Sequence, residues 1–176
     1  MTTTEQPAQD RRPEPSTRAG ERDMLEGWLD YHRATLAWKC QGLDDEQLRR
    51  ASVPPSELTL LGLVRHMADV ERHWFRRILT GEDAPPLHWT DEDPDGDFHV
   101  REDDTWDQAY ATWQEEIAQA RKRADGRSLD EVSAGRSRSG EVFSLRWIYT
   151  HMIEEYARHN GHADLLRERV DGETGE

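Results

Sequence analysis

Apolar residues recur at intervals of three and four positions in four stretches of the chain. This spacing is typical of a helix that buries one face. The four stretches cover residues 21–41, 56–80, 105–125 and 144–170. Polar and charged residues fill the remaining positions of each stretch. The pattern therefore predicts four amphipathic helices of about 20 residues each.

Local signals mark where the predicted helices begin and end. Asp44 is well placed to cap a short helix at residues 45–51, because its carboxylate can accept from free backbone N–H groups. Pro54 and Pro55 then interrupt the chain, since proline cannot continue a helix from inside. Ser56 follows them directly, and we predict it as the cap of the second long helix.

The order of these elements favours an all-α fold, and four long helices in sequence are typical of a four-helix bundle. We find no internal repeat and no clear strand pattern, although residues 140–145 (GEVFSL) permit a brief extended piece. The long 2–3 connection at residues 81–103 has the length to cover one end of the bundle. We predict one bundle domain over residues 20–172, with a disordered, polar tail at 1–19 and a short tail at 173–176.

An imidazole lies in the middle of the apolar face of the last predicted helix. That face consists of Leu145, Ile148, Met152, Tyr156, Ala163 and Leu166. His159 falls at its centre, with Glu155 four residues before it and His162 three residues after it. His66 lies at the edge of the apolar face of the second long helix. Bundle cores are a common place to assemble metal ligands from facing helices, and three protein ligands leave a position open for water or substrate.

The same residues also permit an ordinary structural role. Glu155 could pair with Arg158 at the surface while His159 packs as a neutral side chain, and His66 could be a hydrogen-bonded histidine at a helix edge. A buried carboxylate is costly unless it is paired or coordinated, which favours a metal over an uncompensated acid. His151 lies about 80° around the helix from His159. We therefore expect His151 beside the ligands or facing solvent.

Composition and charge narrow the classes of partner. The chain carries 23 basic and 37 acidic residues, a formal net charge of −14 at pH 7. This charge disfavours binding to nucleic acid and to anionic membrane surfaces. We expect no signal peptide and no membrane span, and the single cysteine, Cys40, fits a cytoplasmic location without an internal disulfide. Hydrophobic residues make up only 34%, so we expect the seven tryptophans to supply much of the core.

Three segments of the chain resemble the DinB-like superfamily in its mini-circle-protein branch. They are LLGLVRHMADVERHWFRR, SLRWIYTHMIEEYARHNGHADLLRE and, between them, WTDEDPDGDFHV. The resemblance covers about residues 21–171. It implies a four-helix bundle with a divalent metal bound by a histidine of helix 2 and by two residues four apart on helix 4. It thereby implies His66, Glu155 and His159 as the ligands, with Glu155 standing where much of the superfamily has a second histidine.

The Glu-x3-His pair is similar to that of the metal-binding domain of mycothiol-dependent maleylpyruvate isomerase. We expect no room in this chain for the additional C-terminal domain of that isomerase, so its substrate is not carried over. The resemblance implies Zn²⁺, with Ni²⁺ or Fe²⁺ as alternatives, and it implies a homodimer. Arg outnumbers Lys by 21 to 2, which indicates a GC-rich coding sequence and fits mycothiol as the thiol co-substrate.

Residues 91–102, DEDPDGDFHVRE, match the pattern of an EF-hand calcium loop. The context argues against this site, because no helix leads into the loop and Pro94 interrupts it. Calcium binding is therefore a minor alternative. We expect an Asx-rich connection over one end of the bundle, in which Trp89, Phe98 and His99 form part of a pocket wall.

The spacing of the histidines and Glu155 supports an open metal site, and the resemblance implies a metal-dependent enzyme of the thiol-S-transferase type. The metal lowers the pKa of a low-molecular-weight thiol, or of water in a hydrolase, for attack on a small electrophile. His162 is the candidate acid or base, although the spacing also permits a fourth ligand or a hydrogen-bond partner of the substrate. Cys40 is a poor nucleophile, because the C-terminal end of a helix disfavours a thiolate. The competing class is a non-catalytic metal-binding or stress-response protein.

Overall fold

The computed structural model describes residues 12–174, and the described part of the chain is helical. Its elements are α1 (Glu21–Cys40), α2 (Asp45–Leu48), α3 (Leu60–Glu71), the π-helical segment η1 (Arg72–Leu79), α4 (Trp106–Ala124) and α5 (Leu145–Asp171). The predicted all-α class is therefore confirmed. The extended piece expected at residues 140–145 is reduced to one isolated bridge between Val132 and Ser144.

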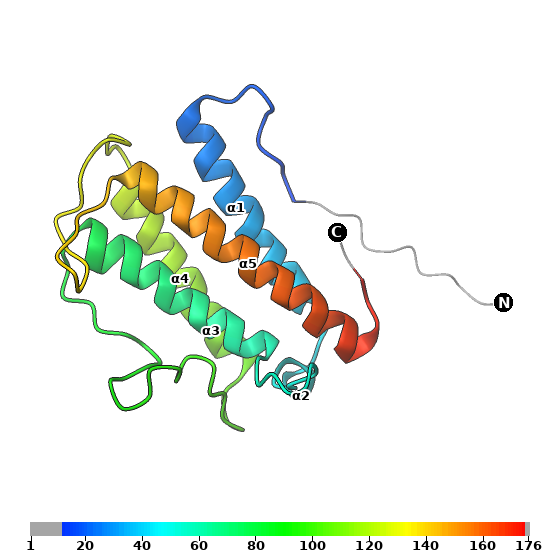
Figure 1. Ribbon diagram of the computed structural model, residues 1–176. Helices are drawn as coiled ribbons and strands as arrows, with labels where there is room; N and C mark the ends of the chain where they lie inside the picture. The colour runs from blue at the N-terminus through cyan, green and yellow to red at the C-terminus, as the bar shows by residue number, and fades with distance from the viewer. Residues whose placement is uncertain (1–11, 175–176) are drawn as a thin grey trace.

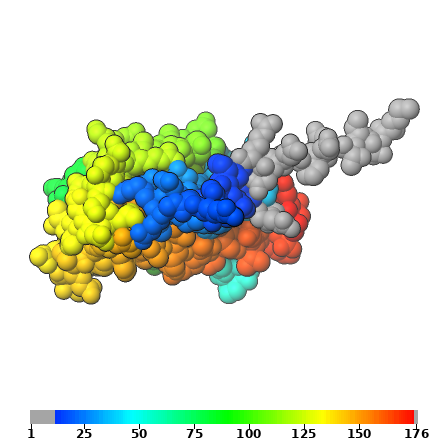
Figure 2. Space-filling view, turned by 90° about the horizontal axis from the view of Figure 1, so that it is seen from above, coloured from blue at the N-terminus to red at the C-terminus, as the bar shows by residue number. Residues whose placement is uncertain are grey.

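The long helices run side by side around a shared core (Figure 1). α5 packs against α1 and α3, and α3 also packs against α4. α1 lies on the face seen in Figure 2, with α5 along one side of it. Among residues 12–174, no helix is both long enough and apolar enough to span a membrane.

Side-chain caps define where most of these helices begin. The Asp44 carboxylate accepts from the Gln47 backbone N–H and the Gln47 side chain accepts in return, which confirms the predicted cap of the short helix. Ser144 caps α5, and its side chain accepts from the Trp147 backbone N–H. The prediction for α3 is wrong by one turn, because the cap is Thr59, whose hydroxyl accepts from the Gly62 N–H at 2.9 Å. Ser56 is instead part of a turn after the two prolines.

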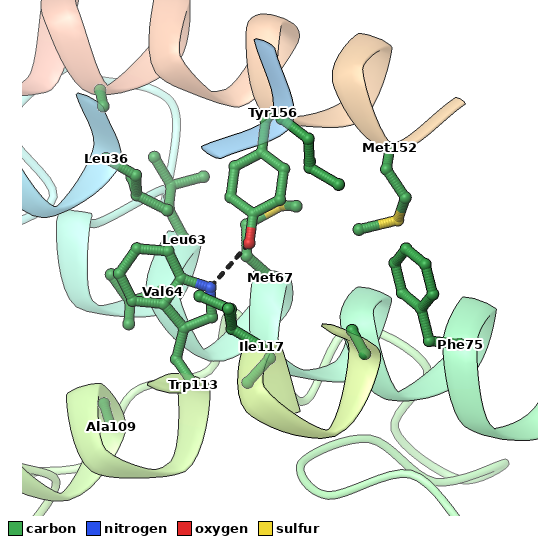
Figure 3. Close-up of a cluster of buried hydrophobic side chains, with 14 of the residues drawn as sticks. Leu36, Leu63, Val64, Met67, Phe75, Ala109, Trp113, Ile117, Met152 and Tyr156 are labelled. Carbon is green, nitrogen blue, oxygen red and sulfur yellow. Dashed lines mark hydrogen bonds between the residues drawn. The ribbon is translucent and has the colours of Figure 1, made fainter. Parts of the chain in front are cut away.

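The core is built mainly from leucines, and the expectation that tryptophans supply much of it is wrong. Within residues 12–174, Trp113 is the one tryptophan that is fully buried. Its indole N–H donates to the Tyr156 hydroxyl at 2.7 Å, between α4 and α5 (Figure 3). The other tryptophans lie half-buried or exposed at the surface. An indole that is partly exposed at the surface is available to pack against a ligand.

A buried ionic network ties three of the helices together at the level of Tyr156. Arg33 of α1 donates two hydrogen bonds of 2.8 Å to the carboxylate of Glu71 at the end of α3. The Tyr156 hydroxyl of α5 donates to the same carboxylate at 2.7 Å. Glu71 is completely buried. The network fixes α5 relative to α1 and α3 at the residue next to Glu155.

The π-helical segment η1 changes which residues of the second long helix face the core. An α-helical continuation would place Trp74 on the apolar face. Hydrogen bonds in a π-helix run to the fifth residue, so each turn contains more residues and the faces shift. Phe75 and Leu79 are buried in the observed structure, whereas Trp74 is only half-buried. Trp74 packs against the edge of the core and is also partly exposed.

The predicted disordered tail at residues 1–19 falls partly outside the described residues. Residues 12–19 lie against α1 instead of extending freely. The Arg12 guanidinium donates to the Thr35 hydroxyl at 2.6 Å and lies over the Trp38 ring, 4.5 Å from its centroid. A cation over an indole face is attracted by the ring quadrupole, which holds this segment on the helix.

The connection between η1 and α4 returns along α3 (Figure 1). Arg65 of α3 anchors it, donating to the Gly96 carbonyl at 3.1 Å and to the Asp104 carboxylate. Gly62 allows close approach, since a Cβ at this position would lie 3.3 Å from the Phe98 carbonyl oxygen. The loop that was expected to cover one end of the bundle is thus held against the helix that carries His66.

Candidate functional site

The apolar face of α5 is buried as the periodicity predicts, and His159 is buried within it with 7% of its surface exposed. Glu155 lies one turn earlier on the same helix. The distance between its Oε2 atom and His159 Nε2 is 3.4 Å. The next residue, Asn160, donates to the His32 carbonyl of α1 at 3.0 Å and so holds this turn of α5 in place. The two side chains therefore project from a fixed element.

His66 reaches the same point from α3. The centroids of the His66 and His159 rings are 4.6 Å apart, with the rings edge to face. One ligand atom from each of His66, Glu155 and His159 lies within 4.8 Å of the other two. The structure thus brings together the three residues that the sequence singled out, although they come from positions almost 90 residues apart.

The loop that covers α3 supplies a partner that sequence reasoning missed. Asp97 is buried, and its Oδ2 atom lies 2.7 Å from His66 Nδ1. Phe98 stacks on the His66 ring at 4.6 Å between centroids. These contacts leave the other nitrogen, His66 Nε2, buried and without a hydrogen-bond partner within residues 12–174. The sequence contains no signal for this contact, because Asp97 is one of many acidic residues in its loop.

Glu155 lies closer to two imidazoles than to the guanidinium of Arg158. Its nearest charged partners are His159 at 3.4 Å and His151 at 3.5 Å, whereas Arg158 is 3.9 Å away and pairs more closely with Glu154. The hydrogen bond from His159 lowers the pKa of the Glu155 carboxyl below its ordinary value, against the opposing effect of burial. The alternative in which Arg158 neutralises Glu155 at the surface is therefore the weaker description.

The two remaining histidines of α5 flank this cluster. His162 Nδ1 lies 3.4 Å from His159 Nδ1 on the side away from Glu155. Burial, followed by the charge of His159, lowers the pKa of His162. His151 is half-buried, stacked on Trp147 at 4.9 Å and edge-on to Trp74 at 4.6 Å. His151 thus lies beside the cluster, as its angle around the helix predicts.

The sequence offers two other candidates, the acidic loop at residues 91–102 and Cys40. Within residues 12–174, the acidic side chains of the loop at 91–102 do not belong to any group of three metal-type ligands within 4.8 Å. Asp93 pairs instead with His99 at 2.9 Å. Cys40 is buried, and burial raises the pKa of its thiol to about 12. A thiol in this state is protonated near neutral pH and is a weak nucleophile.

The chemistry of the cluster fits a divalent metal. Two imidazoles and one carboxylate are common zinc ligands, and three such ligands leave a coordination position open. A metal-bound histidine usually donates its second N–H to a carboxylate or carbonyl, which is the relation between His66 and Asp97. The buried Nε2 of His66, which lacks a hydrogen-bond partner among residues 12–174, is the atom that a metal would satisfy.

A cleft of about 880 Å³ opens beside His66. It lies between the outward face of α3 and η1, the loop at residues 81–97, and the segment at residues 135–138. Of the three residues expected in a pocket wall, Trp89 lines the cleft, Phe98 packs on His66, and His99 is exposed. Of the three candidate metal ligands, His66 lines the cleft, so a small molecule there would lie next to His66.

Comparison with known protein families gives a match over most of the chain. The model of a family described as mycothiol-S-transferase matches residues 24–172. This family belongs to the DinB-like superfamily, so the superfamily predicted from the three sequence segments is confirmed. The matched range includes His66, Asp97, Glu155 and His159. Among curated proteins, none matches the chain.

Proposed function

The chain belongs to the mycothiol-S-transferase family, and we propose that it joins the sulfur of mycothiol to a small electrophilic molecule. The reaction would take place at a divalent metal, most simply Zn²⁺, held by His66, Glu155 and His159. The observation that carries this proposal is the buried His66 Nε2, which lies in a group of three metal-type ligands and has no hydrogen-bond partner within residues 12–174. The arrangement of the four long helices supports the DinB-like four-helix bundle as the scaffold.

Each residue has a distinct part in this proposal. Asp97 accepts from His66 Nδ1 and so fixes the tautomer in which Nε2 faces the ligand group. Glu155 contributes the negative charge that offsets a dication, and His159 brings a second nitrogen from a buried turn. A divalent metal bound there would lower the pKa of a coordinated thiol, so that more of it is present as thiolate near neutral pH.

His162 is the residue we assign to proton transfer. It lies next to the ligand group and is partly exposed, so that it can exchange protons with solvent. An imidazole is a suitable acceptor for the thiol proton near neutral pH. The sulfur then forms a bond to the electrophilic carbon, and the leaving group departs with its bonding electron pair. Cys40 takes no part in this scheme because it is buried and protonated.

Metal content is the first test. Protein purified without chelator should contain about one equivalent of zinc or another divalent metal, measured by elemental analysis. His159→Ala should lose the metal and should also lose the rise in melting temperature that added zinc gives the wild type. His99→Ala is the matched control, because His99 is exposed and pairs with Asp93 outside the ligand group. A metal-free wild type that zinc does not stabilise would contradict the site.

Activity is the second test, and it separates the enzyme from a non-catalytic metal-binding or stress-response protein. The metal-loaded chain should consume mycothiol and monochlorobimane faster than the metal-free chain does. His162→Asn should retain the metal and lose rate. Metal binding without thiol consumption would favour the non-catalytic class, and release of a hydrolysis product without thiol consumption would favour a hydrolase. Light scattering would test the predicted homodimer on the same samples.

A further inference from the structure

We propose that the cleft beside His66 binds the electrophilic substrate, and that this substrate is a planar or aromatic molecule that carries a carboxylate. The planar part would pack against Trp74 and Trp89, and the carboxylate would bind the Arg77 guanidinium. The inference rests on the proposed function, since it names the substrate class of the same site. Three features of the cleft support this substrate class: its volume of about 880 Å³, its aromatic lining and its arginine side chains.

Two tryptophans line the cleft. Trp74 of the π-helical segment packs against the edge of the core and also lies at the wall of the cleft, half-buried. It is supported from behind by Phe143 at 5.2 Å and Trp147 at 5.1 Å between ring centroids. Trp89, from the loop that follows η1, also lines the cleft. Two indoles with ring surface at one cleft favour a flat ligand, because aromatic rings bind other planar groups by stacking or edge contact.

One arginine that lines the cleft favours an anionic ligand over a neutral one. Arg77 lines the cleft, and no carboxylate within residues 12–174 forms an ion pair with its guanidinium. The buried carboxylates of the cleft already have partners: Asp69 accepts from the Leu87 and His88 N–H groups, and Asp97 binds His66. Of the other carboxylates that line the cleft, Glu82 pairs with Arg76 and Arg123, Asp91 lies 3.7 Å from Arg138, and Asp83 is exposed. The Arg77 guanidinium, which has no carboxylate partner within residues 12–174, is therefore the local site for a ligand carboxylate.

The positions along the helix set the size of the ligand. His66, Val70, Trp74 and Arg77 follow one another along the wall of the cleft at steps of three and four residues. His66 belongs to α3 and Arg77 to η1, so the two residues lie at different levels of this wall. A ligand that meets both needs an elongated shape, which one ring with a reactive carbon at one end and a carboxylate at the other provides.

The surrounding charges agree with this assignment. His73 faces the same cleft, and its pKa is lowered by burial and then by the positive charges of Arg77 and Arg138. Arg138 lies at the rim, 5.8 Å from the Trp89 ring centroid and 3.7 Å from Asp91. The positive charge in this part of the cleft is therefore large enough to affect a neighbouring titratable group.

A pair of electrophiles that differ only in charge tests the proposal. With mycothiol and the zinc-loaded chain, 4-(chloromethyl)benzoate should be used with a higher kcat/KM than its methyl ester, each rate corrected for the uncatalysed reaction. Arg77→Met should lower kcat/KM for the carboxylate about tenfold or more, the range expected for loss of a charge-assisted hydrogen bond, and leave the ester within about twofold. Arg169→Met, which removes an exposed arginine at the far end of α5, is the matched control and should change neither rate.

A binding measurement gives a readout that does not depend on turnover. The unreactive analogue 4-methylbenzoate should bind the full chain in isothermal titration calorimetry, and Arg77→Met should weaken this binding while Arg169→Met does not. Transfer to both electrophiles without a preference that Arg77 controls would overturn this inference and leave the proposed function standing. Arg77-dependent binding without any transfer would support the cleft assignment and contradict the proposed function. If the chain shows neither Arg77-dependent binding nor a preference for the carboxylate electrophile, the inference is overturned.

Discussion

Asp97 determines which nitrogen of His66 is available to the candidate metal site. An imidazole can carry its proton on either nitrogen, and the partner of one nitrogen sets the state of the other. With the Asp97 carboxylate 2.7 Å from Nδ1, the neutral ring keeps its proton there and leaves Nε2 as a lone-pair donor. One loop residue thus prepares a ligand that belongs to a helix.

Replacing Asp97 by asparagine should weaken metal binding without unfolding the protein. The amide has nearly the same shape but lacks the negative charge that favours the Nδ1–H tautomer. Loss of such a partner typically costs about 10- to 100-fold in metal affinity, and Asp97→Asn should lie near the lower end because the amide oxygen still accepts. The affinity for zinc would be measured by competition with a chromophoric chelator.

Asp93→Asn is the matched control for this prediction. Asp93 lies in the same loop but pairs with the exposed His99. Equal zinc affinity in Asp97→Asn and the wild type, or an equal loss in both variants, would contradict the role assigned to Asp97.

At the scale of elements, the junction of α3 and η1 has two consequences. Glu71 ends α3 in a fully buried position, where it accepts from Arg33 and Tyr156. Directly after it comes the π-helical segment with Trp74, which packs against the edge of the core and lines the cleft. Segments of π-helix are frequent at functional sites. The same junction therefore holds α5 in place and shapes the cleft wall.

Glu71→Gln should destabilise the fold strongly. The substitution leaves the buried Arg33 guanidinium without its counter-charge, and breaking a buried pair in this way typically costs about 3–5 kcal/mol. We expect the free energy of unfolding, measured by urea titration, to fall by about 3 kcal/mol. Glu115→Gln, on the exposed face of α4, should change it by less than about 0.5 kcal/mol. A change that small for Glu71→Gln would show that the network is not needed for stability.

For the whole molecule, the distribution of charge matters more than its sum. The net charge of −14 is unfavourable for an anionic ligand at most of the surface. The cleft beside His66 nevertheless contains Arg77, which has no carboxylate partner in the described part of the chain, and His73, whose pKa is lowered by burial. The proposed specificity for a carboxylate therefore depends on local placement, which the total charge does not predict.

The neutral state of His73 makes the stability of the molecule depend on pH. Burial, assisted by the charges of Arg77, Arg138 and His151, lowers its pKa to about 4, whereas the unfolded chain has the ordinary value of about 6.5. Between these values the unfolded state binds a proton that the folded state does not. Stability is therefore lost as the pH falls through this window, by on the order of 3 kcal/mol.

Urea unfolding measured between pH 7 and pH 4 tests whether stability falls as the pH falls. His73→Gln should show a shallower fall in the free energy of unfolding than the wild type does. The exposed His99 is the control, because Asp93 raises its pKa and its replacement should not make the fall shallower. A wild type and a His73→Gln variant with parallel pH dependence would contradict the prediction.

The local pattern of the sequence was enough to predict the helices and the inward position of His159. Periodicity is a property of neighbouring residues, and a single helix displays it without reference to the rest of the chain. The start of α3 at Thr59 and not at Ser56 lay beyond this reasoning, because both residues can cap a helix and the preceding turn selects between them. Glu155 and His159, four residues apart on α5, are likewise recognisable as possible zinc ligands from their spacing alone.

Only the tertiary structure decided what surrounds those residues. The contact between Asp97 and His66 joins a loop to a helix 31 residues away, and no local pattern encodes such a contact. The cleft that Trp74 lines is formed by segments far apart in the sequence, namely α3 with η1, the loop at residues 81–97 and the segment at residues 135–138. Amphipathic periodicity thus determines which face of each helix is buried, whereas the packing of helices and loops determines which polar groups meet. The candidate metal site depends on both, and the cleft beside it depends on the packing.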